Sequence, residues 1–431
     1  MKTVQFLSVI LLSFLLIAAC DRQGEHQPID DADNSAELSI DEQLQSVADN
    51  FELMGMAVML LHNHEIAYEG YFGNAVHETG RELGPNSVFR IASITKTVTA
   101  MAMMQLAEEG LVDLDQDVNQ YLGWELRNPN HPDEVITLRH LLGHTSGIRD
   151  GETYPQFARD MIEGKLHIRE LFLPSGDYFW DDMFADHRPG EYFSYSNAAW
   201  GVVASIIEIV SGQRFDSYAK EHLFDPLDMY ASFNTVDIDR DDFAALYRFQ
   251  NGSWVPQVDF YIEETPVDRA YDGYEPGRNG LLFGPQGSLR SNLPAIHTLG
   301  KLLMNGGEVD GVRVLQPSSV EEMTNENWRY TGDNGDTWDD FWMSYGLAVH
   351  RITNREGKDV IFPDRQMMGH PGIAYGLLSD MYMDPETGTG VIFITNGSKQ
   401  EFEYGGSSSF YGVEETVFDI LFSLLEKLES N

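Results

Sequence analysis

Short apolar runs of strand length gather near both ends of the chain. Near the start, the runs at 56–61 and 66–72 are separated by four polar residues, which is the pattern of a β-hairpin. Near the end, the segments 344–350, 376–383 and 390–395 also have the pattern of strands. We therefore expect one sheet that is completed by the two ends of the chain.

Helical patterns flank these strands and fill the middle of the chain. A capping-box pair, Ser39 and Glu42, begins the first predicted helix. Further helices are predicted over 93–110, which stops at a glycine, and over the apolar segment 198–210, which a Ser-Gly pair ends. In the last segment, 415–428, apolar residues recur at helical spacing.

The distribution of these elements predicts an α/β fold: an antiparallel sheet built from both termini, flanked by helices, with a mostly helical region inserted at roughly 95–340. Composition does not change abruptly in the middle of the chain, which favours one catalytic body over two independent domains. We expect this body to cover 40–431. Residues 20–39 are polar and acidic, and we expect them to be a flexible tether that follows a signal peptide at 1–19.

The apolar run at 4–19 is shorter than the ~20 residues of a membrane span and reads as a secretory signal. Cys20, the one cysteine of the chain, ends this run in a Leu-Ile-Ala-Ala-Cys sequence that resembles the lipobox of bacterial lipoproteins. The resemblance implies cleavage before Cys20 and a lipid anchor on it. Asp21 resembles the signal that retains enteric lipoproteins at the inner membrane, so the implied location is the periplasmic face of the cell envelope. An ordinary signal peptide with a coincidental cysteine is the alternative.

Charge narrows the range of partners. The chain of 431 residues carries 69 acidic and 28 basic side chains, a formal charge of -41, which repels nucleic acid and argues against binding to it. With a single cysteine, no disulfide can form within the chain. Two acidic groups, at 237–242 and 333–340, lack the ordered spacing and the glycine of an EF-hand, so we predict no metal site. We expect a monomer.

The strongest chemical signal is a serine and a lysine three residues apart, Ser93 and Lys96. At that spacing on a helix the two side chains share one face. From Arg90 to Glu108 the only charged residue between the two ends is Lys96, so the fold should surround it and lower its pKa. A neutral lysine beside a serine hydroxyl can take its proton while the oxygen attacks a carbonyl group.

Two further motifs follow in order: Tyr195-Ser196-Asn197 and His370-Pro371-Gly372. Together with Ser93-x-x-Lys96 they resemble the three motifs of the serine beta-lactamase and penicillin-binding protein superfamily. The match is to the branch that holds class C beta-lactamases, D-alanyl-D-alanine carboxypeptidases, D-aminopeptidases and related esterases. The resemblance covers roughly residue 41 to the end and implies a beta-lactamase/transpeptidase-like fold that needs no metal or organic cofactor.

The resemblance also implies roles for these residues. Ser93 would be the nucleophile that forms an acyl-enzyme, and either Lys96 or Tyr195 would be the general base. Asn197 would hold the substrate or Lys96, and the oxyanion hole would come from the backbone N–H groups of Ser93 and Ile373, beside Gly372. Removing one such donor typically costs ~3–4 kcal/mol of transition-state stabilisation.

His370 is where the sequence departs from class C beta-lactamases, which carry Lys-Thr-Gly at this place. A histidine offers a cation to a substrate carboxylate only when it is protonated, and Pro371 lacks the hydroxyl and the N–H of a threonine. We therefore expect a hydrolase of peptide-like amides or esters (D-amino-acid peptides, small esters, with beta-lactams as slow acylating ligands). The alternative is a non-catalytic or slowly deacylating penicillin-binding sensor lipoprotein.

Three other segments have no assigned chemistry. The Gly-His-Thr-Ser-Gly sequence at 143–147 has a threonine where a nucleophile elbow needs serine, so we predict that its side chains are structural. Two long excursions, at 149–188 and about 231–280, are rich in aromatic and acidic residues. We expect these excursions to wall the cleft and to decide the substrate.

Overall fold

The computed structural model describes residues 38–163, 165–262 and 273–430. The predicted signal peptide, Cys20 and nearly all of the predicted tether lie outside the described residues. From Ser39 onward the chain forms one compact unit. Within the described ranges, no helix has both the length and the apolar character needed to cross a membrane.

The centre of this unit is a nine-stranded sheet in which every pair of neighbours is antiparallel. Its order, β11-β12-β13-β14-β15-β16-β1-β2-β3, places the first strand beside the last, which confirms a sheet completed by both ends of the chain. The strands are β1 Gly55–His62, β2 Glu65–Val76, β3 Arg81–Glu82, β11 Trp328–Arg329, β12 Ser344–Tyr345, β13 His350–Arg351, β14 Met368–Ala374, β15 Leu377–Asp384 and β16 Thr389–Thr395.

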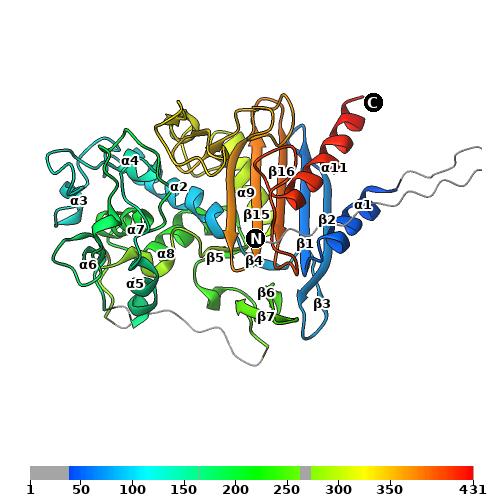
Figure 1. Ribbon diagram of the computed structural model, residues 1–431, viewed down its shortest axis with the longest axis horizontal. Coiled ribbons are helices and arrows are strands. Elements are labelled where there is room, and N and C mark those ends of the chain that lie inside the picture. The colour runs from blue at the N-terminus through cyan, green and yellow to red at the C-terminus, as the bar shows by residue number, and fades with distance from the viewer. Residues whose placement is uncertain (1–37, 164, 263–272, 431) are drawn as a thin grey trace, which may run out of the picture. The chain divides into compact units, whose positions relative to one another are not determined.

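The central strands β1, β15 and β16 are buried on both faces, as their nearly continuous apolar sequences require. On one face, Val58 and Phe393 pack against the helices α1 (Ile40–Asn50) and α11 (Gly412–Glu429), which lie side by side (Figure 1). On the other face, Met59 and Ile392 pack toward α9 (Leu293–Met304). The alternation of neighbouring residues between two helical layers follows from the period of two in a strand.

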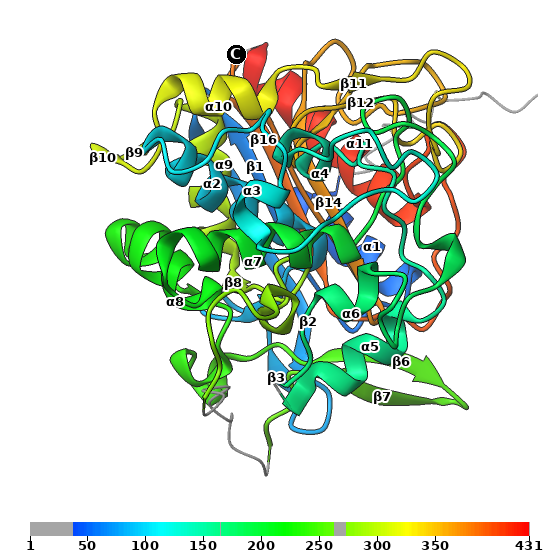
Figure 2. The same ribbon diagram turned by 90° about the vertical axis from the view of Figure 1, so that its left-hand side faces the viewer.

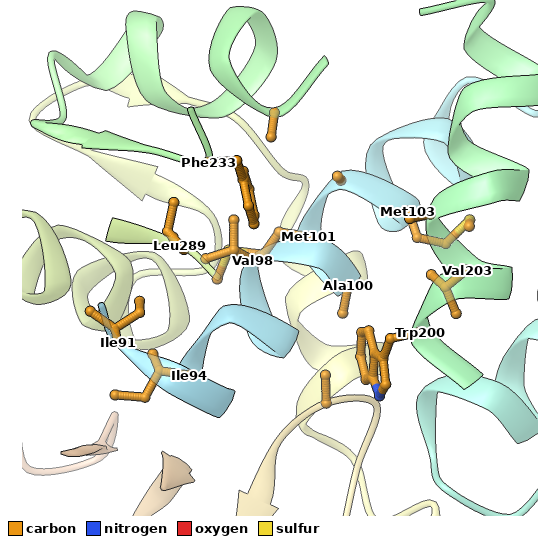
Figure 3. Close-up of a cluster of buried hydrophobic side chains, with 14 of the residues drawn as sticks. Ile91, Ile94, Val98, Ala100, Met101, Met103, Trp200, Val203, Phe233 and Leu289 are labelled. Atoms are coloured by element: carbon orange, nitrogen blue, oxygen red, sulfur yellow. The ribbon is translucent and has the colours of Figure 1, made fainter. Parts of the chain in front are cut away.

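The inserted region is built around two buried helices, α2 (Thr95–Glu108) and α7 (Ala198–Ser211). Figure 2 shows α7 among the shorter helices of this region. These are α3 Asn119–Leu122, α4 Leu138–Leu142, α5 Tyr154–Asp160, α6 Arg169–Phe172 and α8 Phe215–Ala219, while α10 Pro317–Thr324 follows α9. Figure 3 shows how α2 fills its surroundings: Val98 faces Phe233, and Met103 faces Val203 of α7.

The predicted mostly helical region also contains short strands. They form one three-stranded sheet and two hairpins: β4 Val88–Arg90 with β8 Arg290–Asn292 and β5 Ala231–Ser232, β6 Leu246–Gln250 with β7 Ser253–Val258, and β9 Glu308–Val309 with β10 Val312–Arg313. The sheet of β4, β8 and β5 matters for the site, because β4 leads directly into the segment that carries Ser93.

One predicted strand is wrong. The segment 344–350 is not continuous but forms the two-strand hairpin of β12 and β13. Its turn is closed by a hydrogen bond from Gly346 N–H to the Val349 carbonyl oxygen, and Ala348 has a φ of 58°. An alanine in this left-handed conformation gives no signal in the sequence, since glycine or asparagine is the usual residue there.

Candidate active site

Ser93 lies on a single 3₁₀ turn, η1 (Ala92–Ile94), immediately before α2 rather than within the α-helix itself. Of residues 91–100, all of which the structure describes, only Ser93 is not buried. The turn therefore presents one hydroxyl group to the neighbouring pocket while its neighbours are anchored in the core. The N-terminal end of α2 adds a partial positive charge that favours an oxyanion.

Lys96 is fully buried, and its Nζ atom reaches three oxygen atoms. The Ser93 Oγ lies at 3.0 Å, the Asn197 Oδ1 at 2.8 Å and the Gln286 carbonyl oxygen at 2.8 Å. The Lys96 Nζ also lies 4.8 Å from the centre of the Tyr195 ring. The structure thus brings the first two motifs together around one amino group.

Burial lowers the pKa of Lys96 to about 7, although the carboxylate of Asp150 opposes this shift. A neutral amine has two N–H donors and one lone pair. The Asn197 Oδ1 and the Gln286 carbonyl oxygen can only accept hydrogen bonds, so they take the two N–H groups. The lone pair is then left for the Ser93 hydroxyl, which is the arrangement that a base needs to remove the serine proton.

Tyr195 packs between two rings, with its centre 4.3 Å from that of His144 and 5.2 Å from that of Trp342. Burial raises the pKa of Tyr195 well above its usual value, although its hydrogen bond with Ser93 acts in the opposite direction. Tyr195 is therefore a neutral hydroxyl group at physiological pH. It can donate or relay a proton beside Ser93, whereas Lys96 is the group that is ready to accept one.

The carboxylate of Asp150, a residue that was not predicted from the sequence, organises the second motif. One oxygen, Oδ1, accepts hydrogen bonds from the backbone N–H groups of Asn197 at 2.7 Å and Ala198 at 2.8 Å. The other, Oδ2, accepts the Asn197 side-chain amide at 2.8 Å. Asp150 thereby satisfies N–H groups at the start of α7 and orients the Asn197 side chain. No local pattern marks it, because it lies 47 residues before its partner.

The segment 143–147 supports the same motif, which agrees with its predicted structural role. The His144 Nδ1 accepts the Ser196 N–H at 3.1 Å, and the His144 carbonyl oxygen accepts the Ser194 N–H at 2.8 Å. With its ring stacked on Tyr195, His144 fixes both the backbone and the side chain of the Tyr-Ser-Asn segment.

The third motif lies on β14, whose backbone passes close to the turn that carries Ser93. A Cβ atom at Gly372 would lie 2.8 Å from the Ile91 carbonyl oxygen and 2.4 Å from the Ser379 Oγ, so only glycine fits. The Ser379 hydroxyl donates to the Ile91 carbonyl oxygen at 3.1 Å and joins the sheet to this turn. Ile373 follows with half of its surface exposed, and both Gly372 and Ile373 line the pocket beside Ser93.

His370 is fully buried and does not line this pocket. Its Nδ1–H donates to the Pro371 carbonyl oxygen at 2.6 Å, so its Nε2 accepts the Tyr345 hydroxyl at 2.9 Å. Burial and the nearby Lys96 hold the pKa of His370 well below its usual value. The structure therefore places a neutral imidazole where sequence analysis considered a cation for a substrate carboxylate.

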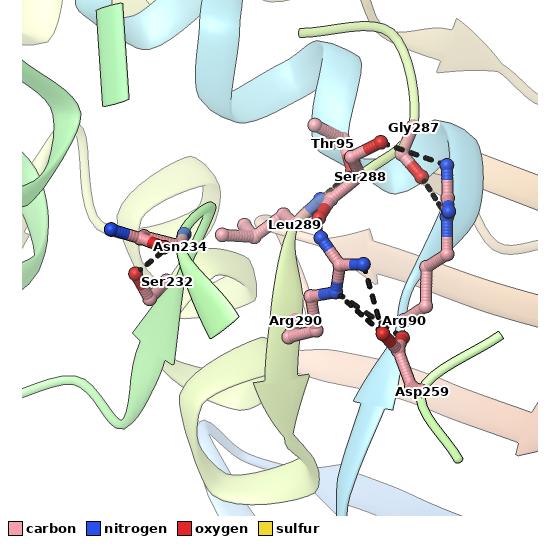
Figure 4. A network of polar contacts seen from close by, with 9 residues as sticks. All are labelled: Arg90, Thr95, Ser232, Asn234, Asp259, Gly287, Ser288, Leu289 and Arg290. Carbon is pink, nitrogen blue, oxygen red and sulfur yellow. Dashed lines mark hydrogen bonds and ion pairs between the residues drawn. The ribbon is translucent and has the colours of Figure 1, made fainter. Parts of the chain in front are cut away.

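A second polar network joins the segment after Gln286 to the residues on either side of Ser93 (Figure 4). The Arg90 side chain donates to the Gly287 carbonyl oxygen and to the Ser288 hydroxyl, both at 2.8 Å. The Leu289 N–H donates to the Thr95 Oγ1 at 3.2 Å. These contacts hold the segment that follows Gln286 against the start of α2.

The pocket encloses about 720 Å³ of space, which includes open solvent at its mouth. We expected the aromatic-rich segments 149–188 and 231–280 to line this pocket, but the described parts of these segments do not line it. The lining residues are Ser93, Tyr195, Asn197, Trp338, Phe341, Trp342, Pro371, Gly372, Ile373, Tyr404, Ser409, Tyr411 and Glu414. Among the described residues, no cluster of three or more His, Cys, Asp and Glu side chains is arranged to hold a metal ion.

Comparison with known families agrees with this geometry. The model of a family described as Beta-lactamase matches residues 43–407 of the chain. That range includes the three motifs and both ends of the central sheet.

Two curated relatives match parts of the chain. Protein flp of Staphylococcus aureus (strain MW2) is 26% identical over 235 residues, which are 54% of this chain and 46% of flp. Penicillin-binding protein 4* of Bacillus subtilis (strain 168) is 31% identical over 176 residues, 40% of this chain and 36% of that protein. The matched part of this chain thus spans less than half the length of these relatives.

Solved structures share the fold over nearly the whole chain. The octameric penicillin-binding protein homologue from Pyrococcus abyssi superposes with a TM-score of 0.64 at 23% identity, covering 90% of this chain and 77% of its own. EstCE1, a hydrolase with promiscuous acyltransferase activity, gives 0.63 at 19% identity, covering 89% and 98%. D-amino acid amidase from Ochrobactrum anthropi SV3 gives 0.61 at 19% identity, covering 91% and 99%.

Proposed function

The chain belongs to the Beta-lactamase family and has its serine hydrolase fold, and from this premise we propose that it cleaves peptide-like amides or esters through an acyl-enzyme at Ser93. One observation carries the proposal. Lys96 has a pKa lowered to about 7, its N–H groups are taken by two acceptors, and its remaining position faces the Ser93 hydroxyl at 3.0 Å.

In the proposed reaction, neutral Lys96 removes the Ser93 proton as Oγ attacks the substrate carbonyl. Negative charge develops on the carbonyl oxygen, and the backbone N–H groups of Ser93 and Ile373 stabilise it. The lysine proton then passes to the leaving amine or alcohol, with the neutral Tyr195 hydroxyl beside Ser93 as a relay. The bond to the leaving group breaks, and water later hydrolyses the acyl ester to restore Ser93.

Two observations support amides and esters over beta-lactams as substrates. Beta-lactams carry a carboxylate, yet His370 is neutral and buried, and no Lys, Arg or His side chain occurs among the described residues that line the pocket. Two neighbours in fold are named as an amidase and as a hydrolase with acyltransferase activity.

The test is intact-mass analysis after treatment with a fluorophosphonate, together with hydrolysis of a p-nitrophenyl ester, a D-alanyl-D-alanine peptide and a chromogenic cephalosporin. We expect one adduct on the wild-type protein, none on Ser93→Ala, and turnover of the ester faster than that of the cephalosporin. Ser146→Ala is the matched control, because Ser146 is a buried serine of the structural Gly-His-Thr-Ser-Gly segment, and this variant should still form the adduct. A wild-type protein with no adduct and no turnover would refute the enzyme. An adduct without turnover would instead indicate a slowly deacylating sensor.

We also propose that Cys20 carries a lipid anchor at the periplasmic face of the bacterial envelope. The support is the lipobox-like sequence alone. Cys20→Ala should move the protein from the membrane fraction to the soluble fraction of cells while its ester hydrolysis is retained. Continued sedimentation of the variant with membranes would contradict the anchor.

A further inference from the structure

The pocket beside Ser93 has a second chemical feature, which the start of α11 contributes. Glu414, in the first turn of α11, lines the pocket although only 4% of it is exposed. Around it the pocket is lined by aromatic side chains: Trp338, Phe341, Trp342, Tyr404 and Tyr411. The carboxylate has no role in the acylation of Ser93 described above, although Trp342 of the aromatic wall also packs against Tyr195.

The Glu414 carboxylate is held in place by its own helix. Its Oε2 accepts the backbone N–H of Tyr411 at 2.7 Å. The Tyr411 and Tyr404 rings stack with their centres 5.0 Å apart and form one side of this compartment. The N-terminal end of α11 favours a negative charge here, so Glu414 is the position where an anion is best tolerated.

A second carboxyl group lies behind Glu414. Asp380 of β15 is fully buried, and no N–H or hydroxyl group among the described residues donates to either of its oxygens. Burial raises the pKa of both carboxyl groups, that of Glu414 to about 7, and the charge of Glu414 raises the pKa of Asp380 further. Asp380, which has no donor among the described residues to stabilise its charged form, therefore keeps its proton, and Glu414 at the start of α11 is the member of the pair that carries the negative charge.

Nothing else that lines the pocket compensates this charge, because the described lining residues include no Lys, Arg or His. A carboxylate in one pocket with several aromatic side chains is a chemical arrangement that attracts an organic cation, through Coulomb attraction and through the negative faces of the rings. The same arrangement repels a carboxylate. If Glu414 served only to cap α11, a glutamine could do so equally well. Capping therefore does not explain why a second carboxyl group, that of Asp380, is buried behind it.

We propose that the compartment formed by Glu414 and its aromatic neighbours binds an ammonium group of the substrate, so that the enzyme prefers cationic amides and esters over neutral or carboxylate-bearing ones. This inference rests on the proposed function, because the compartment and Ser93 line one pocket. The reacting carbonyl lies at Ser93 and the ammonium group at α11. The compartment selects the substrate and takes no part in bond cleavage.

The first test compares p-nitrophenyl esters of one shape and different charge. The cationic substrate is the ester of trimethylammoniobutyrate, the neutral one replaces the trimethylammonium group with tert-butyl, and the anionic one is mono-p-nitrophenyl adipate. We expect kcat/KM for the cationic ester to exceed that for its neutral isostere by about tenfold, with the anionic ester slowest. Glu414→Gln keeps a hydrogen-bond acceptor for Tyr411 and should abolish most of this ratio.

The matched control is Glu426→Gln, which removes one negative charge from the exposed side of the same helix, about 18 Å further along its axis. This variant should keep the wild-type ratio. Equal rates for the cationic and neutral esters, or a ratio that Glu414→Gln leaves unchanged, would overturn the proposal. Thermal unfolding of each variant verifies that a changed ratio does not come from partial unfolding.

A second measurement separates this proposal from the proposed function. Calorimetric titration of the Ser93→Ala protein with benzyltrimethylammonium and with benzoate needs no turnover. Binding of the cation at least about tenfold tighter than that of benzoate supports the compartment even if no ester is hydrolysed, and its loss in Ser93→Ala/Glu414→Gln assigns it to Glu414. Equal or absent binding, with hydrolysis of the neutral ester intact, would refute the compartment and leave the hydrolase standing.

Discussion

The Asp150 carboxylate accepts the side-chain amide N–H of Asn197 at 2.8 Å, and this contact leaves Asn197 Oδ1 to accept the N–H of Lys96, also at 2.8 Å. An amide group can rotate by half a turn and exchange its donor for its acceptor. Asp150 prevents this exchange. Asp150 therefore acts on Ser93 through the side chains of Asn197 and Lys96. Its charge also raises the pKa of Lys96, which opposes the effect of burial.

Asp150→Ala should lower kcat/KM for a p-nitrophenyl ester by about tenfold or more, because Asn197 loses its fixed orientation. It should also lower the unfolding free energy by about 1–2 kcal/mol, since two backbone N–H groups at the start of α7 lose their acceptor. The loss of the negative charge should shift the acidic limb of the pH–rate profile to lower pH. The measurements are the pH–rate profile and urea unfolding.

Asp150→Asn separates these effects. Its amide oxygen can still accept the backbone N–H groups, so most of the stability should be kept, while the charge is removed. The shift of the acidic limb should therefore appear in both variants. If neither variant moved the limb, Asp150 would be structural only.

The pH dependence of the wild-type enzyme follows from the pKa of Lys96, which burial lowers to about 7. The base must be neutral, so kcat/KM should fall about tenfold per pH unit below this pKa and reach a plateau above it. Lys96→Arg keeps a cation that cannot lose its proton and should lower the rate by about a thousandfold at all pH values. A pH–rate profile that stays flat over roughly three pH units, from about pH 5 to about pH 8, would show that Lys96 is not the base.

Gly372→Ala tests the close approach of β14 to the Ser93 turn. The new Cβ would overlap the Ser379 Oγ at 2.4 Å and the Ile91 carbonyl oxygen at 2.8 Å. Overpacking of this kind costs about 1–3 kcal/mol of stability, and displacement of the turn should lower ester hydrolysis. Gly84→Ala, where no atom lies within 4 Å of the new Cβ, is the control and should change neither property. Wild-type melting temperature and activity in Gly372→Ala would contradict the contact.

The parts of the fold that could be predicted are those determined by local geometry. The Ser39–Glu42 capping box begins α1 as expected, with the Ser39 Oγ accepting the Glu42 N–H at 3.2 Å. Ser93 and Lys96 meet because a spacing of three residues places two side chains on one face of a helical segment, whatever surrounds it. The apolar environment of Lys96 was likewise visible in its neighbours along the chain.

The parts that could not be predicted depend on contacts between distant segments. Asp150 is an exposed acidic residue among 69, and only its distance to Asn197 gives it a role. Glu414 lies on an amphipathic helix, where a polar residue normally faces water, and only the packing of α11 against the central sheet places it in the pocket. The aromatic content of the two excursions indicated burial but did not indicate which surface they bury.

The buried ion pair between Arg290 and Asp259 offers the clearest test of stability. Arg290, in the central strand of the sheet formed by β4, β8 and β5, has a side chain 2% exposed, and that of Asp259 is 1% exposed. The Arg290 Nη2 donates to Asp259 at 2.9 Å, and its Nη1 donates to the Ser288 carbonyl oxygen at 2.8 Å (Figure 4). Asp259→Asn keeps the shape of the side chain and tolerates the φ of 58° at this position, yet it leaves the guanidinium group buried without a counter-charge.

We expect Asp259→Asn to lower the unfolding free energy by about 3–5 kcal/mol, measured by urea denaturation. The double variant Asp259→Asn/Arg290→Met should recover part of this loss, because removal of both charges removes the cost of burying one of them alone. Asp310→Asn is the control. The Asp310 carboxylate pairs with Lys301 but is 82% exposed, so this substitution should change the unfolding free energy little. If Asp259→Asn lowered the unfolding free energy no more than Asp310→Asn does, solvent would reach Arg290. The ion pair would then not hold β8 beside β4, the strand that leads to Ser93.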